Sequence, residues 1–192
     1  VIDGGAGSDT AAYTYSNLSD ILISKNKGGG YTTVTNNEGT DVLTSIEILE
    51  DRNGSSSIST LYDAQATPTI SYLLNGASAT ATLDKYSGMI DYIDMRFIGS
   101  ADRQNIQGTE YSEFMNLLGG IDAANGNGGD DILDGGRGSN FLTGGNGQDT
   151  FYVDGRGGAN TWSTITDFTG VDTVRLWGWQ DGVSELVGTQ EN

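Results

Sequence analysis

Apolar residues recur every nine positions through the middle of the chain. Residues 99–152 divide without insertion into six units of nine residues, and the eighth place of every unit is apolar. These eighth-place residues are Ile106, Met115, Ala124, Leu133, Leu142 and Phe151. One such unit is too small to bury its own apolar side chain, so the period predicts a rod in which successive units stack.

Within each unit the pattern separates a loop from a short strand. The first six places of the later units are rich in Gly, Asn and Asp, which favours a loop and permits left-handed backbone. The last three places, such as residues 132–134 and 141–143, are apolar at the centre. We expect each of these triplets to form a very short strand whose middle side chain points inward. The sequence therefore predicts an all-β rod.

The sixth place of every unit ends in a side-chain oxygen, and oxygen is the ligand atom that calcium prefers. The alternative is a set of solvated turns. A turn needs glycine, but it does not need a carboxylate at the same place of every nine-residue unit. We therefore favour metal binding for residues 117–152 and solvated turns for the first two units. The sixth-place residues are Gln104, Glu113, Asp122, Asp131, Asn140 and Asp149.

The last units resemble the RTX nonapeptide G-G-x-G-x-D-x-U-x, a calcium-binding repeat of parallel β-rolls. Residues 144–152, GGNGQDTFY, match every fixed place, and residues 135–143 depart only at Asn140. Residues 126–134 depart only at Asn127, whereas residues 117–125 have leucines for the first glycine pair. The resemblance implies that two units form one coil and that each ion lies between a loop and the loop two units later.

Carried onto this chain, the resemblance pairs Asp131 with Asp149 and Asp122 with Asn140, and backbone carbonyls complete the shells of two to four calcium ions. Residues 4–12, GGAGSDTAA, match the repeat again, and residues 36–44 and 167–175 are weaker echoes. Glu113, Asp167 and Asp172 are further candidates. The remaining implied metal-binding residues are Gly119, Gly120, Gly126, Gly128, Gly129, Gly135, Arg137, Gly138, Gly144, Gly145, Asn146 and Gly147 in the roll, and Gly4, Gly7 and Asp9 near the start.

The flanking sequence consists of short β-rich runs separated by polar turns. We expect four segments: residues 1–60 as the end of a first roll plus a β-meander, residues 61–96 as strands that lead into a second roll, residues 97–152 as a six-unit β-roll, and residues 153–192 as capping strands. Residues 51–59, DRNGSSSIS, are the best linker candidate because they are polar and rich in Gly and Ser.

Composition excludes several classes of function. The net charge of −17 argues against nucleic acid or an anionic membrane surface as partner. The chain has no cysteine and no apolar stretch long enough to span a membrane. It has no histidine either, so it cannot use Ser-His-Asp or Cys-His chemistry. A carboxylate pair acting on a glycoside stays formally open, but we expect no enzyme activity in this fragment.

The resemblance implies a calcium-binding module of a secreted bacterial protein, exported by type I secretion and folded by calcium outside the cell. An alternative is an adhesin or surface-layer module that binds polysaccharide or partner chains. A less favoured one is the non-catalytic tail of a secreted hydrolase, protease or epimerase. In the adhesin interpretation, four exposed aromatic residues make the contacts: Tyr92, Trp162, Trp177 and Trp179. The three tryptophans could instead pack the open end of the roll.

Overall fold

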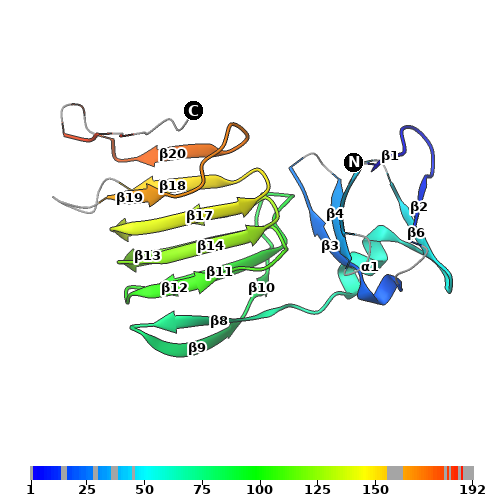
Figure 1. Cartoon of the computed structure of the whole chain (residues 1–192), viewed down its shortest axis with the longest axis horizontal. Coiled ribbons are helices and arrows are strands. Elements are labelled where there is room, and N and C mark those ends of the chain that lie inside the picture. The colour runs from blue at the N-terminus through cyan, green and yellow to red at the C-terminus, as the bar shows by residue number, and fades with distance from the viewer. Residues whose placement is uncertain are drawn as a thin grey trace.

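The computed structural model describes residues 2–13, 17–27, 30–35, 39–44, 46–154, 162–179, 181, 183–185 and 187. The chain forms an N-terminal unit and a parallel β-roll, which lie side by side (Figure 1). The echo at residues 36–44 lies partly outside the described residues.

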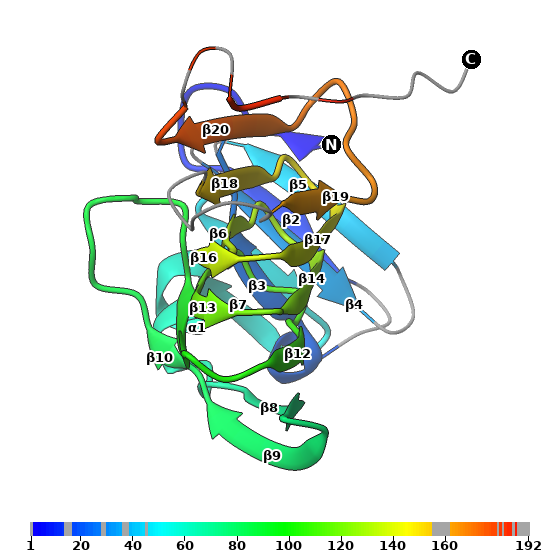
Figure 2. The same cartoon turned by 90° about the vertical axis from the view of Figure 1, so that its left-hand side faces the viewer.

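Two sheets face each other in the roll, as expected for an all-β parallel roll. Figure 2 shows β13 and β16 on one side and β12, β14 and β17 on the other. The first sheet has the order β19 (Ser163–Ile165), β17 (Asn140–Asn146), β14 (Ala123–Gly128), β12 (Gln104–Gln107), β8 (Thr69–Leu74) and β9 (Ala77–Thr82). The second has the order β10 (Asp84–Lys85), β11 (Met95–Ser100), β13 (Glu113–Gly120), β15 (Ile132–Asp134), β18 (Thr150–Asp154) and β20 (Thr173–Trp177), with β16 (Arg137–Gly138) paired to β13.

Strands pair with the strand two units later, in parallel and with an offset of 18 residues. Ile106 lies opposite Ala124, and Ala124 lies opposite Leu142. In the other sheet Leu133 lies between Met115 and Phe151. All six eighth-place side chains are at most 3% exposed and belong to one core. The periodic apolar place therefore forms the interior of the roll, as the sequence predicts.

The roll begins one unit earlier than the six units recognised in the sequence. β11 pairs with β13 in parallel, and Met95 lies opposite Glu113 while Phe97 lies opposite Met115. Residues 90–98 thus occupy the same register as a repeat unit. The sequence pattern missed this unit because its sixth place holds Met95 instead of an oxygen-bearing residue. At the other end, β19 and β20 are the last strands of the two sheets, in the position of the expected capping strands.

The N-terminal unit has its own core and two small sheets. β1 pairs with β5 and β2 pairs with β6 in parallel, and the other pairs are antiparallel. One sheet has the order β1 (Ile2–Asp3), β5 (Gly39–Thr44), β4 (Tyr31–Thr35) and β3 (Leu22–Lys25), and the other has the order β2 (Thr10–Ala12), β6 (Ile48–Asp51) and β7 (Gly54–Ser57). A 3-10 helix covers Leu18–Asp20, and α1 covers Ile58–Ala64.

The expected linker at residues 51–59 is instead ordered structure. β6 and β7 form an antiparallel hairpin, and Asp51 accepts the turn amides of Asn53 at 2.6 Å and Gly54 at 3.0 Å. Ser57 then caps α1 by accepting the amide of Thr60 at 3.2 Å. The polar residues therefore serve as turn and cap groups, and α1 crosses the expected boundary between residues 60 and 61.

β3 and the residues after it contact one edge of the roll. Asp94 accepts hydrogen bonds from Ser24 Oγ at 2.7 Å and from the Lys25 amide at 3.1 Å. Ser112 Oγ donates to the Lys25 carbonyl at 2.8 Å, and the Lys27 amide donates to Asp130 Oδ2 at 2.7 Å. The N-terminal unit is thus held along a row of loops, at the edge seen beside it in Figure 1.

Candidate metal centre

The loops of the last four units share one backbone geometry. Their second and fourth places all have φ in the left-handed region, which glycine adopts most readily and asparagine tolerates. A methyl group on Gly138 would lie only 1.8 Å from the Gly120 carbonyl oxygen of the coil below. The φ values are 63° at Leu118, 74° at Asn127, 64° at Gly136 and 99° at Gly145 for the second place, and 147° at Gly120, 104° at Gly129, 119° at Gly138 and 138° at Gly147 for the fourth.

Sixth-place side chains form a hydrogen-bonded column along each edge of the roll. In the last four units, each accepts the backbone N–H of the sixth-place residue 18 positions earlier. On one edge, here called the acid edge, Asp131 Oδ1 accepts from Glu113 at 2.7 Å and Asp149 Oδ1 accepts from Asp131 at 2.9 Å. The opposite column, here called the amide edge, consists of Gln104, Asp122 and Asn140, in which Asp122 accepts from Gln104 at 2.8 Å and Asn140 accepts from Asp122 at 3.1 Å.

One carboxylate oxygen on each edge is buried without a hydrogen bond from any described residue. These atoms are Asp131 Oδ2 and Asp122 Oδ2. A methyl group on Gly126 would lie 2.0 Å from Asp131 Oδ2 and 2.6 Å from the Gly144 carbonyl oxygen. Two acceptor atoms from loops two units apart therefore border the same point. Burying a carboxylate without a partner is costly, so this arrangement calls for a cation.

Burial raises the pKa of three carboxyl groups on the acid edge, those of Glu113, Asp131 and Asp149. Loss of solvation, followed by the neighbouring Glu113 charge, holds the pKa of Asp131 well above its usual range. Burial raises the pKa of Glu113 to about 8 and that of Asp149 to about 6, and hydrogen bonds to these carboxylates only partly oppose the effect. A cation between the loops would favour the ionised forms and relieve this strain.

The donor set fits calcium. Every candidate ligand atom is an oxygen, and among the described residues no three carboxylate, histidine or cysteine side chains converge on one point. The shell must therefore be completed by loop carbonyls. Calcium accepts such mixtures of carboxylate and carbonyl oxygens at about 2.3 to 2.6 Å, whereas transition metals prefer nitrogen or sulfur.

On the amide edge both atoms of the Asn140 amide group are hydrogen-bonded. Its Oδ1 accepts the Asp122 amide, so its Nδ2 faces the other way and donates to the Gly135 carbonyl at 2.8 Å. The side chain therefore presents N–H to the loop. Asp122 is the one carboxylate in this column of three.

The other predicted backbone ligands lie in stacked loops. Gly119 and Gly120 pair with Arg137 and Gly138, and Gly128 pairs with Asn146. A methyl group on Gly145 would lie 2.1 Å from the Asn127 carbonyl oxygen, and one on Gly147 would lie 1.9 Å from that of Gly129.

Asp9 forms a hydrogen bond with Glu47, a residue that the repeat pattern did not indicate. Its amide donates to Glu47 Oε2 at 2.8 Å, and its own Oδ2 is buried without a partner among the described residues. This arrangement copies the Asp131–Asp149 contact across 38 residues instead of 18. Gly4 donates to the Thr44 carbonyl at 3.0 Å, and Gly7 has a φ of 136°. Sequence reasoning missed Glu47 because β3, β4 and β5 intervene.

Asp167 and Asp172 bind backbone amides at the end of the roll. The two Asp167 oxygens accept the amides of Gly144 at 2.9 Å and Gly145 at 2.7 Å. Asp172 Oδ1 accepts the Asp149 amide at 2.9 Å, and its Oδ2 accepts the Thr169 amide at 2.7 Å. Asp172 thus extends the acid edge, while Asp167 closes the last loop.

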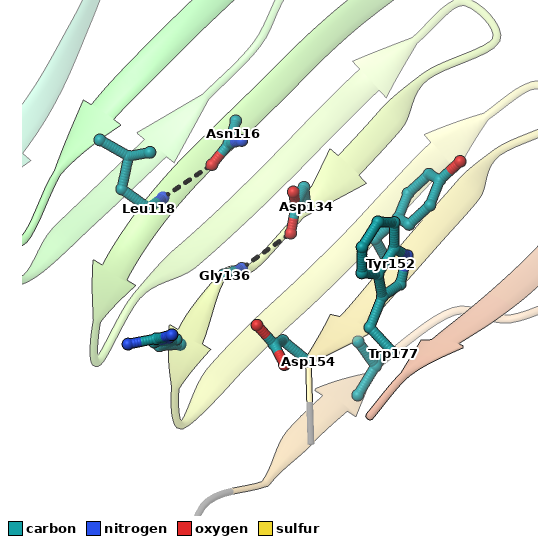
Figure 3. A pocket seen from close by; sticks show the side chains of 9 residues that line it. Asn116, Leu118, Asp134, Gly136, Tyr152, Asp154 and Trp177 are labelled. Carbon is teal, nitrogen blue, oxygen red and sulfur yellow. Dashed lines mark hydrogen bonds between the residues drawn. The ribbon is translucent and has the colours of Figure 1, made fainter. Parts of the chain in front are cut away.

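A separate cavity of about 230 Å³ lies on the outer face of the second sheet. Figure 3 shows the rings of Tyr152 and Trp177 side by side, with Asp134 and Asp154 close by. The ring centroids are 6.4 Å apart with the planes tilted by 55°. None of the sixth-place residues lines this cavity, so it is a second candidate site of different chemistry.

Comparison with known proteins assigns the repeats. Residues 118–151 and 125–161 match the RTX calcium-binding nonapeptide repeat, in four copies. No curated protein matches the chain at a significant level. Among the described residues, no helix has the length and apolar character needed to cross a membrane. The match covers the units whose loops carry the left-handed places and the buried carboxylates. Residues 118–161 therefore carry RTX calcium-binding nonapeptide repeats.

Proposed function

We propose that the chain is a calcium-triggered folding module of a secreted bacterial protein, ordered outside the cell. The observation that carries the proposal is the buried, unpartnered oxygens of Asp122 and Asp131, which accept no hydrogen bond from the described residues. The matched family binds calcium, and a bound calcium ion supplies the positive charge that these oxygens lack. Export by type I secretion rests on the resemblance to RTX proteins.

In this proposal the acid edge provides the best position. Asp131 and Asp149 contribute two carboxylates, and the carbonyls of residues 126–130 and 144–148 complete the shell. Asp122 contributes one carboxylate on the amide edge, and Asp9 with Glu47 forms a related pair in the N-terminal unit. Two to four ions fit this set of residues.

Ion binding is large enough to decide whether the roll folds. Neighbouring strands lie about 4.8 Å apart, so stacked carboxylates repel each other when no cation is present. At a free calcium concentration ten times the dissociation constant, each ion adds about 1.4 kcal/mol to the free energy of unfolding. Four ions would add about 5 to 6 kcal/mol, which is comparable with the whole stability of a small domain. Extracellular calcium modules bind with dissociation constants of about 10⁻⁴ to 10⁻³ M, far above cytosolic calcium.

A calcium titration followed by far-ultraviolet circular dichroism tests the proposal. The β signal is expected to rise with calcium and to disappear in excess chelator, while magnesium at the same concentration leaves the spectrum of the chelated protein unchanged. A spectrum that is the same in excess chelator and in calcium would contradict calcium-triggered folding.

The exposed aromatic residues favour a second candidate, an adhesin or surface module that binds polysaccharide. Trp177 is 52% exposed beside Tyr152 in the outer cavity, and Asp134, Asp154 and Arg137 border the same space (Figure 3). Aromatic faces with polar groups around them suit sugar rings.

A glycan array tests this second candidate. Trp177→Ala is expected to remove binding, whereas the equally exposed Phe168, which does not line the cavity, serves as the control in Phe168→Ala. We also propose that the chain has no catalytic activity. Cleavage of a bound glycan by the chain itself would contradict that proposal.

A further inference from the structure

The first coil of the six recognised units places an amide and a carboxyl at equivalent positions. Gln104 is the sixth residue of the first unit and Glu113 is the sixth residue of the second, and both precede the matched residues 118–161. We propose that Glu113 is an additional calcium ligand at the start of the acid edge, and that the amide nitrogen of Gln104 replaces the ion on the amide edge. This inference rests on the proposed calcium-binding function and specifies its sites.

Gln104 points its amide nitrogen into a cage of carbonyl oxygens. Its Nε2 donates to Ser100 O at 3.1 Å, to Asp102 O at 3.1 Å and to Leu117 O at 3.2 Å. Its Oε1 accepts the Ser100 amide at 3.2 Å, which fixes the orientation of the amide group. The side chain is only 2% exposed. Loop carbonyls that could bind a cation are therefore already satisfied by N–H groups.

Glu113 stands in the same relation to its own loops, but with an acceptor in place of a donor. A methyl group on Gly108 would lie 2.4 Å from Glu113 Oε2, 2.5 Å from Met115 Cε and 2.6 Å from the Gly126 carbonyl oxygen. The corresponding distances at Gly126 are 2.0 Å to Asp131 Oδ2 and 2.6 Å to the Gly144 carbonyl oxygen. The pair of oxygens that borders Gly126 thus recurs at Gly108 one coil earlier, where the Met115 methyl group lies beside it. Glu113 Oε2 also accepts the Thr109 amide, whereas Asp131 Oδ2 has no partner among the described residues.

The partners of Glu113 hold its carboxylate in place without adding positive charge. The Thr109 amide donates to both carboxylate oxygens at 3.2 Å, and Thr109 Oγ1 donates to Oε1. The Glu113 side chain is fully buried, and Asp131 accepts its amide at 2.7 Å. The buried carboxylates of Glu113 and Asp131 are therefore linked through one loop, and the Gly126 carbonyl oxygen faces Glu113. A cation between Glu113 and this carbonyl would compensate the negative charge.

The same distinction continues along the amide edge. Asn140 Nδ2 donates to the Gly135 carbonyl at 2.8 Å, as the Gln104 amide does to its loop. Asp122 therefore lies between two neutral amides in its column, whereas Asp131 lies between Glu113 and Asp149. Calcium is expected to fill the acid edge at lower concentration than the Asp122 position.

A reciprocal exchange of Gln104 and Glu113 tests the inference, because the two side chains have the same length. The number of bound ions is measured by native mass spectrometry, and calcium affinity is measured by isothermal titration calorimetry. We expect Glu113→Gln to bind one ion fewer than the wild type and Gln104→Glu to bind one ion more. The double exchange is expected to restore the wild-type count. Asp102→Asn, which removes an exposed charge from the Gln104 loop, is the control and should leave the count unchanged.

The Glu113 and Gln104 variants test separate parts of the inference. An unchanged ion count and affinity in Glu113→Gln would overturn the assignment of Glu113, and the absence of an added ion in folded Gln104→Glu would overturn that of Gln104. Circular dichroism in saturating calcium confirms that each variant is folded. If the wild type itself bound no calcium, the proposed function would fail instead, so the two failures are distinguishable.

Discussion

The acid edge and the amide edge of the roll share one backbone arrangement, but two of the three side chains on the amide edge, Gln104 and Asn140, end in an amide instead of a carboxylate. On both edges a sixth-place oxygen accepts the amide of the residue 18 positions earlier. The second atom is a buried oxygen at Asp131 and an N–H group at Gln104 and Asn140. The comparison teaches that hydrogen bonding and the apolar interior set the stacking, while the second atom sets the need for a cation.

The acid edge has a further task, because its loops also hold the N-terminal unit. The fifth-place residues form another column, in which Ser112 donates its amide to Asp94 at 3.0 Å and Asp130 donates its amide to Ser112 Oγ at 2.9 Å. Ser24, Lys25 and Lys27 dock on this column. The residues that contact the N-terminal unit are thus adjacent in sequence to the proposed calcium ligands.

The largest expected effect on calcium affinity comes from replacing the central carboxylate of the acid edge, Asp131, by an amide. In Asp131→Asn, Oδ1 can still accept the Glu113 amide, and Nδ2 can donate to the Gly144 carbonyl, as in Gln104. We expect calcium affinity at this position to fall at least tenfold, because the charge is lost. Without calcium, replacing the unpartnered buried oxygen by a satisfied amide is expected to stabilise the fold by about 1 to 3 kcal/mol.

Asp131→Ala provides the matched comparison, because it removes both the charge and the acceptor for the Glu113 amide. It is expected to be less stable than Asp131→Asn with or without calcium. Urea unfolding followed by circular dichroism at a series of calcium concentrations, extrapolated to zero calcium, measures both effects. Equal stability of the two variants at the zero-calcium limit would show that an amide at this position does not replace the ion.

A pH-dependent effect is expected where the acid edge meets the N-terminal unit. Burial raises the pKa of Asp94, and hydrogen bonds from Tyr62, Ser24, Ser112 and Lys25 only partly oppose this. Since the folded-state pKa exceeds the unfolded value of about 3.9, the folded state binds more protons. The contribution of Asp94 to stability is therefore fully present below about pH 3.9 and is lost as pH rises through the raised value.

Asp94→Asn removes this titration. Urea unfolding in saturating calcium, repeated between about pH 4 and 7, should show a decline in wild-type stability relative to the variant as pH rises. Parallel pH profiles for the two proteins would contradict the assignment. Lys25 contacts Asp94 through its backbone amide, and its side chain is the same in the wild type and the variant.

The smallest expected effect concerns Lys27, whose ammonium group lies near the acid edge. Its Nζ donates to the Gln148 carbonyl and, at 3.2 Å, to Thr150 Oγ1. Burial lowers its pKa, although Asp130 and Asp149 oppose the shift. In Lys27→Met the loss of positive charge is expected to raise calcium affinity by about twofold, the size of an interaction worth a few tenths of a kcal/mol.

Lys25→Met is the control for this effect, because Lys25 Nζ lies 4.9 Å from the Tyr62 ring centroid, within the N-terminal unit. Isothermal titration calorimetry at low salt measures both variants. An equal change in calcium affinity for Lys25→Met and Lys27→Met would indicate a general charge effect. The difference between them is expected to shrink as salt is added.

The sequence predicts much of the roll because its signals are local and periodic. The eighth-place residues from Ile106 to Phe151 form the core, and strands two units apart pair with each other. The departure at Asn127 is also explained, since its φ of 74° is one that asparagine tolerates. The assignment of metal ligands stays a prediction.

The remaining features depend on contacts that no local pattern encodes. The unit at residues 90–98 carries Met95 where the pattern requires an oxygen, so the period alone could not reveal it. Residues 51–59 look like a linker, yet Asp51 orders their turn. Glu47 meets Asp9 only because two parallel strand pairs bring them together. The direction of the Gln104 amide depends on a carbonyl at Leu117 in the next coil.

Residues 24–27 of the N-terminal unit dock on the fifth-place column. The proposed calcium loops therefore bind two partners, the ion and the N-terminal unit. Ser112 and Asp130 contact that unit, and each immediately precedes a proposed calcium ligand, Glu113 or Asp131. Two ligands that order the same loops are linked, and linkage is reciprocal. Under the proposed function, each ion that orders these loops strengthens docking of the N-terminal unit, and docking strengthens ion binding by the same factor. The calcium concentration then sets how tightly the two units are held together.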